Sequence, residues 1–413
     1  MKRLIIRNLG PIKSVDIRLN KVNVFIGPQG SGKSTIARII SFCNWLEKVN
    51  EVTEKVVVSG LENELERYHH MKGYFDEKTQ ILFEGENIAV VYNWKSNLLP
   101  LASRFLNGHQ EHYHEKEYVY YTIEKNENPK VIYIPAERNF VSAVPNLSKY
   151  AEKDDVLQSF LNDWFEAKRH YPEDKPFDVV NLGFKYYYNS VGNSDELQLG
   201  NMTKIALTDA ASGYQSIVPL ALMVRWLSSG IYEENRPFSP DEIQKVRNIL
   251  AHVSGSTTET ESQVIERIRG FIQGKIYSHT QFIIEEPEQN LFPKTQMDLL
   301  YNLISEINHG RNHRLVMTTH SPYLLYALNN CMLAYLVKDN VDKEEAKEIE
   351  CIPYALNPND VFVWSIKDGC LRNSNGEAHK TIQDERGLIR KNYFNDVMRQ
   401  VMGDFNKLLE YDD

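Results

Sequence analysis

Long apolar runs are missing from this sequence. The longest ones fall far short of the ~20 residues that a helix needs to cross a membrane. The first residues, Met1 to Arg7, are too short and too interrupted by charge for a signal peptide. We therefore expect a soluble, cytoplasmic protein that makes no membrane contact.

Paired cysteines are also missing. The four cysteines, Cys43, Cys331, Cys351 and Cys370, form no Cys-x-x-Cys pair, so neither a zinc site nor a disulfide framework is indicated. We expect them to be structural thiols in a reducing compartment.

Clustered positive charge is the third feature that the chain lacks. The net charge is −9 and no run of five Lys or Arg occurs. A surface that coats nucleic acid needs a basic field to neutralise phosphates, so this composition argues against one. A local basic groove, assembled by folding or by oligomerisation, stays open.

The clearest positive signal is an apolar strand, 22–26, that runs into a glycine-rich loop and then a helix. The loop fits the pattern Gly-x-x-x-x-Gly-Lys-Ser, and Ile36, Ile39 and Ile40 continue it at helical spacing. Such a loop binds phosphates through backbone N–H groups and the helix N-terminus. Lys33 would reach the β and γ phosphates, and Ser34 would offer a hydroxyl to Mg²⁺. The candidate nucleotide-binding residues are Gly27, Pro28, Gln29, Gly30, Ser31, Gly32, Lys33, Ser34 and Thr35. The alternative is a chance glycine-rich turn.

The segments around this loop alternate between strand and helix patterns. Residues 3–20 predict a β-hairpin, and 50–130 predict further strands with one or two helices. Within the latter, 108–115 hold three histidines and two glutamates; we expect a solvated loop, with a metal site as the alternative. Residues 131–139 predict a buried strand with a charged tip, where Glu137 and Arg138 would contact a nucleotide, a metal or another subunit, or form a structural ion pair. Residues 145–205 predict a helix followed by a hairpin.

A helix is predicted after residue 211, because Ile217, Leu220, Ala221, Val224 and Leu227 recur at helical spacing. Ser212 and Gly213 stand where this helix begins. Ser212 is either a helix N-cap or part of a second anion site that receives the γ-phosphate bound by another molecule. Residues 233–280 predict polar helices, with a mobile Ser/Thr-rich link at 254–262.

Two later strands end in polar tips. The strand 281–284 ends at Glu285 and Glu286, paired carboxylates of the kind that complete an ATPase site. Glu285 would bind Mg²⁺, and Glu286 would orient and deprotonate the attacking water. After a helix at 294–308, the strand 314–319 ends at His320, which would contact the γ-phosphate or the attacking water. A solvent-facing acidic tip and a structural histidine are the alternatives.

The chain closes with a strand at 361–366 and a helical tail. Phe394, Met398, Val401, Phe405 and Leu408 fall on one stripe of that tail. Packing onto the body is the default expectation, and docking to a partner or to a second copy is the alternative.

Four segments together resemble a known family. Gly27 to Thr35, Ala211-Ser212-Gly213-Tyr214-Gln215, Ile284 to Glu288 and Thr318 to Pro322 are similar to the Walker A, signature, Walker B and switch-histidine motifs of ABC-type ATPases. The Glu-Glu-Pro-Glu and Thr-His-Ser-Pro strings resemble the RecF, SMC and OLD branch. The resemblance implies a head-to-tail homodimer, or a higher oligomer, in which Ser212, Gly213 and Gln215 of one subunit close on the ATP held by the other.

The sequence departs from the family pattern at several points. Glu285 stands where an Asp is usual, Tyr214 stands where a second Gly is common, and the glutamine loop has no clear equivalent. The chain has no long heptad arms, and the residues after His320 show no acidic cluster resembling a Toprim nuclease.

The expected fold is therefore α/β: an ABC-type P-loop ATPase head with a mixed sheet, an N-terminal antiparallel β subdomain and an inserted helical lobe. We place the N-terminal part of the ATPase lobe at 1–140, the inserted signature lobe at 141–280, the C-terminal part of the ATPase lobe at 281–370 and the helical tail at 371–413.

The resemblance implies a Mg²⁺-dependent ATP hydrolase that acts as an ATP-gated dimeric switch. Such a switch would resemble the ATPase subunits of bacterial anti-phage systems of the Septu, PARIS and retron-associated types. Those subunits control a separately encoded nuclease or toxin, with DNA or a phage component as the trigger. Two alternatives stay open: a RecF-like DNA-repair ATPase, and an ATP-dependent scaffold with negligible hydrolysis.

Overall fold

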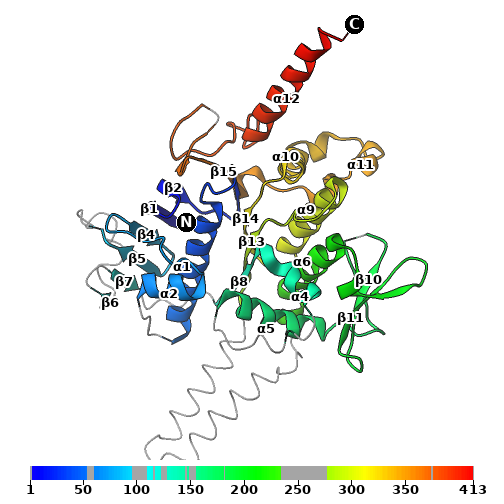
Figure 1. The fold of residues 1–413 in the computed structure, drawn as a ribbon, viewed down its shortest axis with the longest axis horizontal. Helices are drawn as coiled ribbons and strands as arrows, with labels where there is room; N and C mark the ends of the chain where they lie inside the picture. Colours follow the sequence, from blue (N-terminus) through cyan, green and yellow to red (C-terminus); the bar gives the residue numbers. More distant parts are fainter. Residues whose placement is uncertain are drawn as a thin grey trace, which may run out of the picture.

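The computed structural model describes residues 2–53, 60–94, 109–114, 117–121, 128–144, 147, 155–180, 182–233, 277–373 and 375–412. They form a mixed α/β structure around one large sheet, with a second small sheet at its side (Figure 1). The predicted fold class, α/β with a mixed sheet, is confirmed. The Ser/Thr-rich link predicted at 254–262 lies outside the described residues.

Five neighbouring strands of the large sheet are parallel. They lie in the order β15 (Val361–Lys367), β3 (Val22–Ile26), β14 (Arg314–Thr318), β13 (Thr280–Glu285) and β8 (Lys130–Ile134). β3 and β13 are buried along their whole length, as expected for parallel strands covered on both faces. Because the five strands run in one direction, their carboxyl ends lie along one edge of the sheet.

The other half of the sheet is mainly antiparallel and comes from the N-terminal region. It contains β1 (Arg3–Leu9), β2 (Ile12–Arg18), β4 (Gln80–Glu84), β5 (Ile88–Tyr92), β7 (Glu117–Tyr121) and β6 (His109–His114), and it meets the parallel half through β16 (Cys370–Leu371). The hairpin predicted at 3–20 is confirmed, since β1 pairs with β2. The loop predicted at 108–115 is wrong: 109–114 pair with β7 as an edge strand. Pairing with a neighbouring strand outweighs the low strand propensity of this polar segment.

Alternate residues of the parallel strands enter two different cores. Val24 and Ile26 of β3 pack with helices α5 (Val156–Lys168), α6 (Ser212–Ser228), α9 (Pro293–Ile307) and α10 (Pro322–Val337). Phe25 points to the opposite face and packs with α1 (Lys33–Thr53) and the antiparallel strands. This split follows from the two-residue period of a strand. The sheet therefore separates α1 from the other large helices (Figure 1).

The helical lobe carries the small sheet, which runs β12 (Lys204–Ala206), β11 (Ser194–Gln198), β10 (Lys185–Asn189) and β9 (Phe177–Asp178). The helix and hairpin predicted within 145–205 are confirmed by α5 and the β10–β11 pair. Trp164 of α5 is fully buried and packs on Tyr186 of β10, with ring centroids 5.9 Å apart. The shorter helices are α2 (Leu61–Tyr68), α4 (Phe140–Ala143) and α11 (Glu345–Glu348).

The C-terminal helix α12 (Tyr393–Leu409) projects from the body (Figure 1). Asn392 starts it with a capping box, and none of its residues is buried. Phe394 is half-buried against the main core, whereas Met398, Val401, Phe405 and Leu408 are exposed. The default expectation that this stripe packs onto the body is therefore wrong. No helix in the described part of the chain is long and apolar enough to span a bilayer.

Trp164 gives a direct test of the helical lobe. Replacing it with Ala leaves a cavity between α5 and β10, so Trp164→Ala should lower the free energy of unfolding by about 3–5 kcal/mol. Phe165→Ala, at the half-buried neighbouring position, should cost about 1 kcal/mol. Urea denaturation followed by circular dichroism measures both. Equal, small losses for the two variants would contradict the packing described here.

Candidate functional site

The sequence-predicted site residues lie on segments that follow four neighbouring strands. The glycine-rich loop follows β3, Glu286 follows β13, His320 follows β14 and the 3-10 turn η2 (Ala136–Asn139) follows β8. Parallel pairing puts all four carboxyl ends at one edge. In open α/β sheets this is the edge where ligands bind.

The glycine-rich loop depends on backbone conformations that favour glycine. Gly27 has φ +148° and Gly32 has φ +105°. A Cβ at Gly27 would lie 2.2 Å from the Ile366 carbonyl oxygen, and one at Gly32 would lie 2.7 Å from the Ile12 side chain. Any other residue at these positions would force the loop away from β15 and from β2. The two glycines of the motif therefore place the loop as well as shape it.

Lys33 is held inside this loop. Its Nζ donates to the carbonyl oxygens of Gly27 and Pro28, each at 2.9 Å. Burial lowers the pKa of Lys33 to about 8, while the nearby charges of Glu286, Glu288 and Glu285 act in the opposite direction. The ammonium group is thus close enough to all three carboxylates to sense their charge.

Glu285 ends β13 and is buried, with 3% of its surface exposed. Burial and the charge of Glu285 raise the pKa of Tyr133, whose hydroxyl also accepts a hydrogen bond from Arg38 Nε at 3.4 Å. The Oε1 atom of Glu285 has no hydrogen-bond partner among the described residues. A buried carboxylate oxygen without a donor is a fitting ligand for a hard cation.

Glu286 is the next residue and adopts a left-handed backbone conformation, with φ +43°. Its amide donates to the Thr318 carbonyl at 3.0 Å, which fastens the turn to β14. One carboxylate oxygen lies 3.4 Å from His320 Nε2. The hydrogen bond from His320 lowers the pKa of Glu286, against the effect of partial burial. The carboxylate form of Glu286, the form that can accept a proton, is therefore favoured.

Glu288 is a site residue to which the sequence analysis assigned no role. Its Oε1 accepts from the His320 backbone N–H at 2.6 Å, and burial raises its pKa. Ser321 then caps α10 by accepting from the amides of Tyr323 and Leu324. His320 is thus held between a carboxylate and a helix N-terminus. In the sequence, the third acidic residue of the Glu-Glu-Pro-Glu string is the feature that could have indicated this role for Glu288.

Among the described residues Arg138 does not form the structural ion pair that was one of its two predicted roles, and its contact with a nucleotide, a metal or another subunit stays a prediction. Its side chain is fully buried and donates only to backbone carbonyl oxygens, among them those of Glu285 and Glu286. None of the described ion pairs involves it. Glu137, by contrast, is exposed.

Ser212, Gly213 and Gln215 lie in the first turn of α6. Ser212 is exposed and is the first helical residue, so it is not the N-cap; that position belongs to Ala211. Gln215 Nε2 donates to the carbonyls of Leu207 and Thr208, within its own lobe. No hydrogen bond or ion pair among the described residues joins these three residues to the glycine-rich loop.

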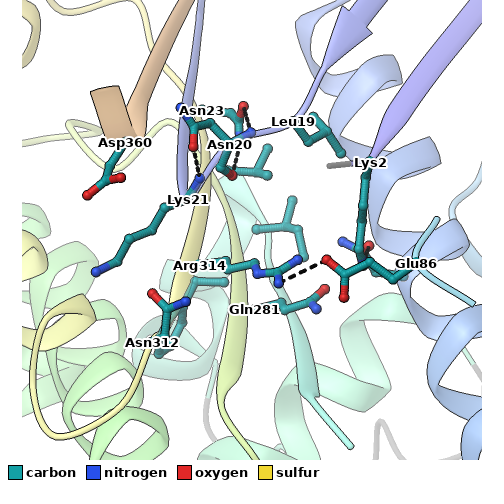
Figure 2. Close-up of a pocket in the computed structure, with 14 residues that line it drawn as sticks. Lys2, Leu19, Asn20, Lys21, Asn23, Glu86, Gln281, Asn312, Arg314 and Asp360 are labelled. Carbon is teal, nitrogen blue, oxygen red and sulfur yellow. Dashed lines mark hydrogen bonds and ion pairs between the residues drawn. The ribbon is translucent and has the colours of Figure 1, made fainter. Parts of the chain in front are cut away.

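A separate cavity of about 310 Å³ lies at the opposite edge of the sheet, where β3, β13 and β14 begin (Figure 2). Lys2, Lys21 and Arg314 line it, and each has a polar partner within the chain: Glu47, Asn308 and Glu86, respectively. Lys2 and Arg314 are thus paired with carboxylates, whereas Lys21 bonds a neutral amide.

Comparison with known proteins finds a family match for the N-terminal region only. Residues 1–142, about a third of the chain, match the model of the AAA ATPase domain family. No curated protein matches the chain.

Several solved structures are similar at a distance. The SMC head domain from Thermotoga maritima is 12% identical, with a TM-score of 0.33, covering 79% of this chain and 90% of that one. An Smc head from Pyrococcus furiosus, bound to the C-terminal domain of ScpA, is 10% identical with a TM-score of 0.31, covering 89% and 95%. An ABC-transporter ATP-binding cassette in its ADP conformation is 10% identical with a TM-score of 0.32, covering 90% and 89%. Similarities this distant do not indicate a function.

The His320–Glu286 contact predicts a measurable shift in protonation. His320→Gln removes the group that lowers the pKa of Glu286, so the pKa of this carboxyl should rise. Carbon NMR titration of protein labelled at the glutamate carboxyls measures it, with Glu286→Gln identifying the resonance by its loss. An unchanged pKa in His320→Gln would show that the contact does not stabilise the carboxylate.

Proposed function

We propose that this chain is an ABC-type ATPase that hydrolyses ATP to ADP and phosphate in a Mg²⁺-dependent reaction. The observation that carries the proposal is the meeting of Lys33, Glu286 and His320 at one sheet edge, with His320 Nε2 3.4 Å from Glu286. The match of residues 1–142 to an AAA ATPase domain supports it. The four motifs lie in the chain order that the resemblance requires.

The residues present fit the phosphates of ATP and a magnesium ion. The loop Gly27 to Thr35 would receive the phosphates through its backbone N–H groups and the ammonium of Lys33. Ser34 and Glu285 would hold Mg²⁺, and the buried, unpartnered Oε1 of Glu285 suits that role. No cluster of three or more His, Cys, Asp or Glu in the described part could hold a metal by itself, which suits an ion that shares its shell with phosphate and water. The ion would supply charge neutralisation of the phosphates.

Glu286 acts as the general base in this proposal. Its carboxylate takes a proton from the attacking water, the water oxygen bonds to the γ-phosphorus, and the bond to the β–γ bridging oxygen breaks. His320 orients Glu286, and Glu288 fixes the backbone of His320. We assign the three carboxylates different tasks because their surroundings differ: one is buried beside Tyr133, one faces His320 and one bonds the main chain.

The proposed catalytic unit is a dimer. Ser212 is exposed at the start of α6, where a helix N-terminus and a hydroxyl can receive phosphate oxygens from outside the chain. In the dimer, Ser212, Gly213 and Gln215 of one copy meet the ATP that Lys33 and Ser34 of the other copy bind. ATP then joins the subunits, and hydrolysis separates them.

We further propose that this switch regulates a separately encoded effector, a nuclease or toxin, in bacterial anti-phage defence, with DNA or a phage component as the trigger. The resemblance to anti-phage ATPase subunits supports this role, and the exposed stripe of α12 offers a surface for a protein partner. Co-expression with the product of the adjacent gene, followed by phage challenge, tests it. Protection that is unaffected by Lys33→Ala would overturn the role.

Glu286→Gln should slow turnover strongly and keep ATP binding. Losing the general base should slow hydrolysis by about 10²–10⁴-fold, so ATP should accumulate in the site and hold two copies together. Phosphate release and light scattering with Mg²⁺ and ATP measure the two effects. Glu345→Gln, at an exposed site on α11, should behave like the wild type. Unimpaired turnover in Glu286→Gln would remove Glu286 from the mechanism.

Nucleotide affinity should weaken as pH rises from 7 to 9. Because the pKa of Lys33 is about 8, its ammonium form, which attracts phosphate, predominates below that pH and is lost above it. Binding at pH 9 should then take up a proton, and the Kd of a fluorescent ATP analogue should increase by roughly tenfold. Lys33→Arg stays protonated throughout. Its affinity, whatever its level, should be flat over this range, and a parallel decline would assign the pH effect to another group.

A further inference from the structure

Arg138 uses its full hydrogen-bonding capacity on backbone carbonyls. Nη1 donates to Pro135 at 3.3 Å and to Glu285 at 2.9 Å, and Nη2 donates to Glu286 at 3.0 Å and to Pro287 at 3.1 Å. Nε donates to Ser216 at 3.3 Å. A guanidinium has five N–H groups, so these five bonds leave none for a ligand.

Among the described residues Arg138 forms no ion pair, although four glutamates lie near enough to act on its charge. Burial lowers its pKa to about 10, and the charges of Glu288, Glu286 and Glu137 oppose that effect, so the group stays protonated at neutral pH. Its partners are carbonyl dipoles that point toward it from three segments. A buried guanidinium with these partners fixes the conformation of the backbone around it.

The main chain that it organises is unusual. Three consecutive carbonyls, those of Glu285, Glu286 and Pro287, converge on one side chain. A strand cannot do this, because its successive carbonyls point in opposite directions. The left-handed Glu286 makes the convergence geometrically feasible, and such a backbone conformation is strained for a residue other than glycine. The Arg138 bonds offset that strain.

The same guanidinium also reaches the first turns of α6. It bonds the carbonyl of Ser216, and the Ser216 hydroxyl in turn accepts from Asn290 Nδ2 at 2.9 Å. A Cβ on Gly213 would lie 3.1 Å from the Asn290 carbonyl oxygen, so the start of α6 and the turn after β13 are in close contact. The segment that carries Ser212 and Gly213 is therefore tied to the one that carries Glu286.

We infer that Arg138 is a positioning residue that couples the start of α6 to Glu286. A displacement of α6, as when Ser212 and Gly213 engage a partner's nucleotide, shifts the Ser216 carbonyl and through Arg138 the backbone of Glu286. Glu286 is then aligned for catalysis only when α6 is in its engaged position. This inference rests on the proposed ATP hydrolysis for its consequence, and on the hydrogen bonds alone for the tether.

Arg138→Lys tests the coupling, because a lysine keeps the charge and can donate to three carbonyls at most. We expect kcat to fall by about tenfold or more and the KM for ATP to change by less than about twofold, since the loss affects the chemical step. In a Glu286→Gln background, Arg138→Lys should add no further loss, since it acts through that residue. Arg225→Lys, on the same helix α6 and paired with Glu306, is the matched control and should retain normal kcat.

Amide hydrogen exchange tests the tether without reference to hydrolysis. Arg138→Lys should speed exchange both in the turn 285–290 and in the first turns of α6, while Arg225→Lys should affect neither. Measurements are made below the melting transition of each variant, as followed by circular dichroism. Faster exchange in one segment alone, a wild-type kcat, or a further loss in the Glu286→Gln background would each overturn the inference. A wild type that hydrolyses no ATP would instead refute the proposed function, and the exchange result would still decide the tether.

Discussion

The parallel pairing of β3, β14, β13 and β8 is the constraint on which the site depends. Their shared direction sends four chain segments, which lie between residues 27 and 320, to one edge of the sheet. β3 and β13 are buried along their whole length, so neither can slip in register without exposing apolar side chains. The packing of the strands in the core therefore sets the positions of Lys33, Glu286 and His320. The loops supply the chemical groups, and the sheet supplies the spacing.

Much of this arrangement could be predicted from local patterns. The apolar strands 22–26 and 281–284 each end at the motif that the sequence indicated, and the glycines of the loop stand where φ is strongly positive. The helix from Lys33 and the hairpin at 3–20 could also be predicted, because the periodicity of apolar residues indicates which side chains face a core. Each of these features depends on residues that lie close together in the chain.

Other features depend on contacts that no local pattern reports. The polar strand at 109–114 pairs with β7, and five of its six residues have little preference for a strand. Arg138 looks like a surface charge at a strand tip, yet it is buried because α6 and the turn after β13 close over it. Glu288 has its role only because His320, 32 positions along the chain, presents a backbone N–H to it.

The helix α12 stands apart from this interlocked structure, and its stability has a different origin. Its described support includes the Asn392 cap, the Phe394 contact, a hydrogen bond from Asn395 to the Tyr326 hydroxyl of α10 and the i,i+3 pair of Arg399 with Asp396. A 17-residue helix held mainly by local terms is only marginally stable in water. Its helix content therefore follows solution conditions and occupancy of its apolar stripe, while the sheet stays intact. Any protein that covers that stripe gains contact area and also completes the folding of this segment, so its binding carries the heat-capacity signature of coupled folding.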